Sequence, residues 1–152
     1  MKLQTPVADL KCRVGISYEN KITMLGSCFS DNIGGRLRDY GFDVLINPFG
    51  TLYNPISIMQ SVEMLLSDNI FTKEDCMEMG AGSDLICSFS HHTSFARNNV
   101  DEFLKHANQA LEEARAHFMK SDRVIITLGT SWCFRHTESG KVVSNCLKRP
   151  GT

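Results

Sequence analysis

The sequence is most informative at Lys21-Ile22-Thr23-Met24-Leu25-Gly26-Ser27-Cys28-Phe29, where a short apolar run ends in a glycine and a serine. The run predicts a buried strand, and from Phe29 to Tyr40 apolar residues recur close to the 3.6-residue period of a helix. A serine between such a strand and a helix lies where backbone N–H groups are unpaired and the helix dipole favours negative charge. The position suits a nucleophile, because attack on an acyl carbon creates an oxyanion that needs such donors, and it equally suits a simple helix cap.

The residues that follow extend this unit into a strand–helix–strand pattern. Gly41 ends the helix and residues 42–46 predict a second strand, so the two strands should be parallel. Asp31 lies in the first turn of the helix, where negative charge suits the dipole. Gly34 and Gly35 disfavour a helix, and their presence indicates close packing against a neighbour.

The second strand leads into the loop Asn47-Pro48-Phe49-Gly50-Thr51-Leu52-Tyr53-Asn54-Pro55, whose prolines and glycine predict a fixed, non-repetitive conformation. Asn54 suits the N-cap of a helix that should run to about Ser67. We then expect a short helix, a strand, a long helix, a buried strand and a hairpin, over residues 72–79, 84–91, 101–119, 123–128 and 133–144. The run 123–128 is rich in β-branched residues and should be covered on both faces. We therefore predict an α/β fold with a short parallel sheet and a β-hairpin insertion.

Composition favours an ordinary globular domain. The chain has 152 residues, 42% of them hydrophobic and 22% charged, and its net charge of −1 lacks the lysine and arginine excess that nucleic acid requires. It has no apolar run of about 18–20 residues and no signal-peptide stretch near Met1. We therefore expect a cytoplasmic protein of one domain with no nucleic-acid or membrane partner. Its six cysteines include no C-x-x-C pair, which predicts reduced and mostly buried thiols.

Three glycine-containing loops should meet at one edge of the predicted sheet, because ligands in open parallel sheets bind beyond the carboxyl ends of the strands. These loops are Gly26-Ser27-Cys28, Asn47-Pro48-Phe49-Gly50-Thr51 and Gly129-Thr130-Ser131-Trp132. Each places a glycine near small polar groups, so each can offer a backbone N–H to a substrate oxygen.

Five blocks of the chain, in this order, resemble the GSCFA family. They are Leu25-Gly26-Ser27-Cys28-Phe29-Ser30, residues 47–55, Ser88-Phe89-Ser90-His91-His92-Thr93-Ser94-Phe95, Thr127-Leu128-Gly129-Thr130-Ser131-Trp132 and Asn145-Cys146-Leu147-Lys148. That family looks like a branch of the SGNH/GDSL hydrolase superfamily. The resemblance implies a flavodoxin-like, three-layer α/β/α sandwich and the cleavage of esters, often acetyl groups on carbohydrates. The expected partner is therefore a carbohydrate or other small-molecule ester.

The resemblance also assigns roles to individual positions. It implies that Ser27 is the nucleophile and that the backbone N–H groups of Ser27 and Gly50 hold the oxyanion. Gly129 lies where the superfamily has a glycine followed by an asparagine, but Thr130 stands in the asparagine position here. The third donor is therefore open between Asn145, Thr130 and the neighbouring serine.

The superfamily's late Asp-x-x-His block has no counterpart in this chain. A serine nucleophile needs an adjacent base, so we expect the N-terminal part of a longer hydrolase domain, with little or no esterase activity by itself. His91 and His92 are local candidates, but adjacent strand residues point to opposite faces, so at most one would face the cleft. We interpret this pair as structural or substrate-positioning.

Other readings of the sequence remain open. The alternative function is a non-catalytic module that binds carbohydrate or protein in the same cleft, and an open sheet edge could pair with a second copy to form a homodimer. Cys133-x-x-His136 has ligand-like spacing, but no second closely spaced pair completes a zinc site, so we expect no metal and no cofactor. Cys28 is a rival nucleophile, since a helix start lowers the pKa of a thiol. We favour Ser27 because we expect the Cys28 side chain to turn toward the helix interior.

Overall fold

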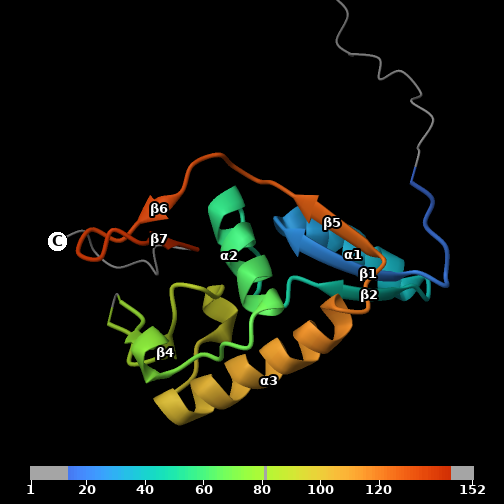
Figure 1. Cartoon of the computed structure of the whole chain (residues 1–152). Coiled ribbons are helices and arrows are strands. Elements are labelled where there is room, and N and C mark those ends of the chain that lie inside the picture. The colour runs from blue at the N-terminus through green and yellow to red at the C-terminus, as the bar shows by residue number, and fades with distance from the viewer. Residues whose placement is uncertain (1–13, 81, 145–152) are drawn as a thin grey trace, which may run out of the picture.

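The computed structural model describes residues 14–80 and 82–144, which include a sheet of three parallel strands at one side of the molecule (Figure 1). The strands β1 (Lys21–Gly26), β2 (Asp43–Ile46) and β5 (Arg123–Thr127) lie in the order β2-β1-β5. β1 and β2 run parallel on either side of α1 (Cys28–Asp39) in the sequence, which confirms the predicted strand–helix–strand unit. Gly26 pairs with Thr127, so the chain segments that leave β1 and β5 start side by side.

Helices cover both faces of this sheet. Ile22 and Met24 of β1 pack with Ile33 and Leu37 of α1 on one face. On the opposite face, Thr23 contacts α3 (Val100–Phe118). α2 (Pro55–Leu66) packs beside α3 in a second core that is built from Phe49, Leu65, Phe71, Phe103, Ala107, Leu111 and Ala114. This arrangement is the predicted α/β/α fold class with its short parallel sheet.

Two small antiparallel pairs flank the sandwich. β6 (Phe134–Arg135) pairs with β7 (Val142–Val143), which confirms the predicted hairpin. β3 (Met77–Glu78) pairs with β4 (Ile86–Cys87), a shorter strand than the one predicted over residues 84–91. The helix predicted over residues 72–79 is wrong: η1 (Lys73–Asp75) is a single turn, and the chain then enters β3. A second single turn, η2 (Thr93–Phe95), precedes α3.

The outer strand β5 departs from its prediction. Its β-branched run forms a strand as expected, but Val124 is 46% exposed and Ile126 is 50% exposed, so coverage on both faces was wrong. Ile125 packs toward α1 on the other face. A run of β-branched residues predicts the strand itself, whereas the elements that lie over it depend on contacts distant in sequence.

Glycine packing and cysteine exposure were predicted only in part. A Cβ at Gly34 would lie 2.7 Å from Cγ1 of Ile46, which confirms close packing there, whereas a Cβ at Gly35 would meet no atom within 4 Å. Cys87 is buried, but Cys28 and Cys133 are exposed, so mostly buried thiols were a wrong expectation for the described part of the chain. None of its helices is both long and apolar enough to span a membrane.

Candidate functional site

Ser27 lies in the turn between β1 and α1 and is 7% exposed. Its Oγ accepts a hydrogen bond from the N–H of Phe29 at 3.4 Å, so it is the N-cap of α1. The same Oγ lies 3.1 Å from Oγ1 of Thr127 at the end of β5, and that oxygen lies 2.7 Å from Oγ of Ser30. The Ser27 hydroxyl therefore belongs to a chain of three neutral hydroxyl groups at the carboxyl edge of the sheet.

The glycine before Ser27 allows this turn to form. Gly26 has φ +136°, a conformation that L side chains rarely adopt, and a Cβ there would lie 2.1 Å from the carbonyl oxygen of Thr127. The Ser27 N–H donates to that same carbonyl at 2.9 Å. The close approach of β1 and β5 at Gly26 and Thr127 thus fixes the position of the Ser27 backbone, and with it the Cβ of Ser27.

The loop after β2 is tied to the Ser27 turn through Asp31 and Asn47. Oδ1 of Asn47 accepts from the N–H of Gly26 at 2.7 Å, and Nδ2 of Asn47 donates to Oδ1 of Asp31 at 2.6 Å. Oγ1 of Thr51 donates to Oδ2 of Asp31 at 2.7 Å. From the sequence, Asp31 was interpreted only as a charge that suits the helix dipole. Its partners Asn47 and Thr51 lie 16 and 20 residues further along the chain, so no local sequence pattern predicts these hydrogen bonds.

Gly50 packs closely against the histidine segment. It has φ +81°, and a Cβ there would lie 2.3 Å from Cβ of His92. The N–H of Gly50 donates to the carbonyl of Asn47 at 2.7 Å, and the N–H of His92 donates to the carbonyl of Phe49 at 2.9 Å. The loop after β2 and the histidine segment therefore hold each other in place.

The loop after β5 lies directly against Ser27. A Cβ at Gly129 would lie 3.2 Å from Cβ of Ser27 and 2.7 Å from Cδ1 of Tyr53. The N–H groups of Gly129 and Thr130 both donate to the carbonyl of Tyr53, at 2.9 and 3.1 Å. The structure thus brings Gly129 to Ser27 as the sequence suggested. Asn145, the other candidate donor, lies outside the described residues.

The Ser27 and Gly50 N–H groups, which were expected to bind an oxyanion, and the N–H of Gly129 next to Ser27 all donate to carbonyl groups of the chain. Those of Ser27, Gly50 and Gly129 have the carbonyls of Thr127, Asn47 and Tyr53 as acceptors. Within the described part of the chain, the N–H of Cys28, the first residue of α1, has no acceptor. Its side chain is exposed, so the expectation that it turns toward the helix interior was wrong.

His91 and His92 do not contact the Ser27 hydroxyl. His91 is 1% exposed, its ring packs against Phe71 and Phe95 with centroids 4.5 and 4.6 Å away, and its Nδ1 lies 2.6 Å from Oγ of Ser88. Burial lowers the pKa of His91 to about 3, so this ring is neutral at physiological pH. Nδ1 of His92 accepts from the N–H of Ser94 at the start of η2. His91 and His92 therefore contact the loop after β2, His91 through the ring of Phe49 and His92 at Gly50.

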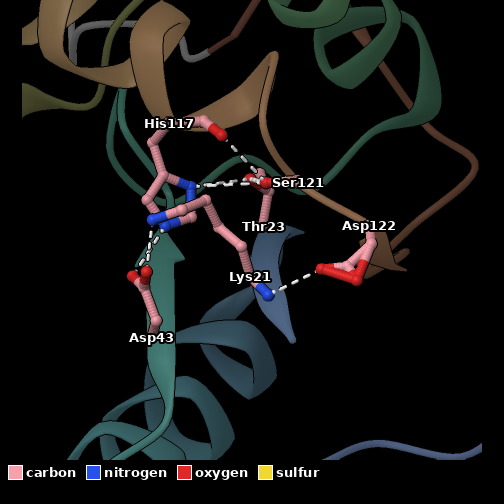
Figure 2. A network of polar contacts seen from close by, with 6 residues as sticks. All are labelled: Lys21, Thr23, Asp43, His117, Ser121 and Asp122. Carbon is pink, nitrogen blue, oxygen red and sulfur yellow. Dashed lines mark hydrogen bonds and ion pairs between the residues drawn. The ribbon is translucent and has the colours of Figure 1, made fainter. Parts of the chain in front are cut away.

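A second polar network occupies the opposite, amino edge of the sheet (Figure 2). Nε2 of His117 lies 3.0 Å from Oδ1 of Asp43, and its Nδ1 lies 3.3 Å from both Oγ1 of Thr23 and Oγ of Ser121. Lys21 also pairs with Asp43. Hydrogen bonds from Lys21 and His117 lower the pKa of Asp43. The sequence gives no local sign of this network, because His117 and Asp43 are 74 residues apart.

His117 is too far from Ser27 to activate it. Thr23, its partner in β1, precedes Ser27 by four residues, which corresponds to roughly 13 Å along a strand. Among the described residues, the hydrogen-bond partners of the Ser27 hydroxyl are Thr127 and the Phe29 N–H. The histidine and the serine therefore belong to separate sites.

A cavity of about 310 Å³ lies between α2 and β7. Its walls include Phe49, Phe71, Phe89 and Val143, together with the hydroxyls of Ser57 and Ser61; Ser27 does not line it. The part of the chain that the structure describes contains no group of three histidine, cysteine or acidic side chains arranged to hold a metal ion.

Comparison with known proteins identifies the family. The family model described as the GSCFA family matches residues 21–152, which include both edges of the sheet. The chain therefore belongs to the GSCFA family. No curated protein and no solved structure matches it.

Proposed function

We propose that this GSCFA-family protein is a serine acyl hydrolase that acts on O-acyl esters of carbohydrates or other small molecules, with Ser27 as its nucleophile. The observation that carries this proposal is the position of the Ser27 hydroxyl at the carboxyl edge, beside the N–H of Cys28 at the start of α1, which has no acceptor in the part of the chain that the structure describes. Negative charge that develops there is favoured by the helix dipole. The resemblance of the family to SGNH/GDSL hydrolases supports the same chemistry.

In the proposed reaction, Oγ of Ser27 attacks the ester carbonyl and its proton passes to a base. The alcohol then leaves with a proton, and water hydrolyses the acyl–serine intermediate. The oxyanion reaches the Cys28 N–H without competition, whereas the N–H groups of Ser27 and Gly50 would first have to leave their carbonyl partners. Neither Thr127 nor the Phe29 N–H is a base, and residues 1–13, 81 and 145–152 contain no histidine. We therefore propose that the base is an Asp–His pair of the superfamily type, supplied by a part of the protein after residue 152.

Hydrolysis of p-nitrophenyl acetate by the full-length protein tests this proposal. We expect turnover that Ser27→Ala reduces by about a thousandfold or more, since loss of the nucleophile removes the acyl intermediate. Ser121→Ala is the matched control, because it removes a hydroxyl at the other edge of the sheet and should keep the wild-type rate. Equal turnover by wild type and Ser27→Ala would rule the proposal out.

The second candidate is a non-catalytic module that binds carbohydrate or protein at the same carboxyl edge of the sheet. The commitment of the Ser27, Gly50 and Gly129 N–H groups to carbonyls favours it, because a binding module needs no oxyanion site. It predicts a folded wild-type protein with no esterase turnover, and ligand affinity that survives Ser27→Ala. Calorimetric titration of both proteins with acetylated and unacetylated oligosaccharides would separate the two functions.

A further inference from the structure

We infer that Asp31 and Asn47 form a clamp that positions Ser27 for reaction, an inference that rests on the proposed role of Ser27 as nucleophile. Neither side chain hydrogen-bonds to the Ser27 hydroxyl. Instead they fix the Gly26 peptide groups immediately before it. They are therefore positioning residues, which act on Ser27 through the backbone.

The clamp holds Gly26 from both sides. The N–H of Gly26 donates to Oδ1 of Asn47 at 2.7 Å, and the carbonyl of Gly26 accepts from the N–H of Leu52 at 2.9 Å. Asn47 is itself anchored, since its N–H donates to the carbonyl of Met24 at 2.9 Å. Both peptide groups of the residue that turns the chain from β1 into Ser27 are thus bonded to the loop after β2.

Asp31 connects this loop to α1, one turn after Ser27. One carboxylate oxygen accepts from Nδ2 of Asn47 and the other from Oγ1 of Thr51, so a single side chain holds two positions of the loop. Hydrogen bonds to an ionised carboxylate are roughly twice as strong as neutral ones. Hydrogen bonds thus link Gly26 to Asn47 and Asn47 to Asp31, and the backbone of α1 links Asp31 back to Ser27. Together these links form a closed ring that contains the Gly26–Ser27 turn.

The chemistry of Asn47 is specific to this ring. Its side chain must accept from a backbone N–H and donate to a carboxylate at the same time, which an amide can do and an ionised carboxylate cannot. Its backbone has φ +40°, a left-handed conformation that asparagine and aspartate tolerate better than most residues. It is 8% exposed, so water competes poorly for these bonds.

The experiment compares Asn47→Asp with the swapped double variant Asp31→Asn/Asn47→Asp. In Asn47→Asp, two carboxylates face each other in place of the 2.6 Å amide–carboxylate bond. In the double variant, Asn at 31 donates to Asp at 47, Asp at 47 still accepts from Gly26, and Asn at 31 accepts from Thr51. All three bonds return; only the bond between positions 31 and 47 has its polarity reversed, and the net charge is unchanged.

Two readouts separate the clamp from the proposed reaction. The first is hydrogen exchange of the Gly26 amide, and the second is the rate at which a fluorophosphonate probe modifies Ser27 in the full-length protein. We expect Asn47→Asp to speed exchange and to lower the maximal labelling rate, each by about tenfold or more, with little change in reversible probe affinity. The swapped variant should recover most of both. Asn108→Asp, which breaks a comparable amide bond to Phe71, should leave both readouts at the wild-type level.

The outcomes are distinct. Unchanged Gly26 exchange in Asn47→Asp, or failure of the swap to restore it, overturns the clamp. Altered exchange with unaltered Ser27 labelling overturns its positioning role. A wild-type protein that is not labelled overturns the proposed function instead, and Gly26 exchange alone then decides whether the clamp exists. If Asn47→Asp does not fold, Thr51→Val removes one bond to Asp31 and should change both readouts a few-fold in the same direction.

Discussion

The amino and carboxyl edges of the sheet hold their hydroxyl groups in opposite ways. At the amino edge, the hydroxyls of Thr23 and Ser121 meet His117, which is paired with Asp43 (Figure 2). At the carboxyl edge, the partners of the Ser27 hydroxyl among the described residues are the neutral Thr127 hydroxyl and the Phe29 N–H. By residue type alone, the amino edge looks more like a Ser–His–Asp site.

The helix ends explain why the carboxyl edge is nevertheless the better candidate. His117 lies in the last turn of α3, where the helix dipole favours positive charge and opposes an oxyanion. Ser27 caps the first turn of α1, where the dipole has the opposite sign and where the Cys28 N–H has no acceptor among residues 14–80 and 82–144. A helix N-terminus, as at Ser27, suits acyl transfer, whereas a helix C-terminus, as at His117, suits a stabilising network.

The largest effect is expected from Gly26→Ala at the carboxyl edge. The new Cβ would lie 2.1 Å from a backbone carbonyl oxygen, and the residue would keep φ +136°. We expect a loss of about 4 kcal/mol or more in unfolding free energy, or failure to fold. Gly41→Ala is the control, since Gly41 has φ +88° but open space around it, and it should lose only about 1–2 kcal/mol. Equal losses in urea denaturation would show that the contact with β5 does not hold the turn.

Acid should weaken the fold through His91, which supports the loop at the carboxyl edge. Its pKa of about 3 in the folded state lies below the ordinary value of 6.5, so the unfolded chain binds a proton that the folded chain excludes. Unfolding free energy should therefore fall as pH decreases below 6.5, by about 3 kcal/mol at pH 4. Denaturation of wild type and His91→Gln across this range measures the effect. A pH dependence that is identical in the two proteins would contradict a buried neutral His91.

At the amino edge, His117→Ala should reduce stability without affecting Ser27. The variant removes the bonds from α3 to Asp43 and Thr23, which we expect to reduce the unfolding free energy by about 1–2 kcal/mol. The labelling rate of Ser27 should stay at the wild-type value. His106→Ala offers a control on the same helix, since its ring contacts Phe95 and not the sheet. A labelling rate that drops only in His117→Ala would show that the two edges are coupled and would contradict separate sites.

The smallest effect is expected from Asp43→Asn. The Asp43 side chain is 53% exposed, so its pairs with Lys21 and His117 contribute at most about 1 kcal/mol at neutral pH. Because these pairs lower the pKa of Asp43 in the folded state, the contribution is complete above the ordinary value of 3.8 and is lost as pH falls below it. Denaturation at neutral pH and near pH 2 should show the difference between variant and wild type shrinking in acid. A difference that is equal at both pH values would exclude the ion pairs as its source.

The sequence predicted the elements better than the contacts between them. Apolar runs and helical periodicity located β1, α1, β2, α2, α3 and β5 to within a few residues, because each pattern is local. The exposed face of β5 was missed, since the cover of a strand depends on distant segments. The His117–Asp43 pair and the hydrogen bond between Asp31 and Asn47 were missed for the same reason, since each joins residues that are distant in sequence.

The candidate site was predictable in position and not in hydrogen bonding. The placement of Ser27 between a strand and a helix, and of Gly129 beside it, followed from parallel-sheet topology. The acceptors of the Ser27 and Gly50 N–H groups could not be predicted in this way. Both acceptors are backbone carbonyls, and the side chains of those residues do not indicate which N–H groups pair with them. Side-chain partners that join separate loops therefore had to come from the structure.

Fluorophosphonate labelling of the full-length protein, with the modified residue mapped by mass spectrometry, determines whether Ser27 is the reactive serine. The probe reacts with a serine whose proton can be removed and whose developing charge is stabilised. We predict modification of Ser27, loss of the label in Ser27→Ala, and an unmodified Ser121 in both proteins. Modification of Ser121, or a label that persists in Ser27→Ala, would contradict the assignment of the reactive site to the carboxyl edge.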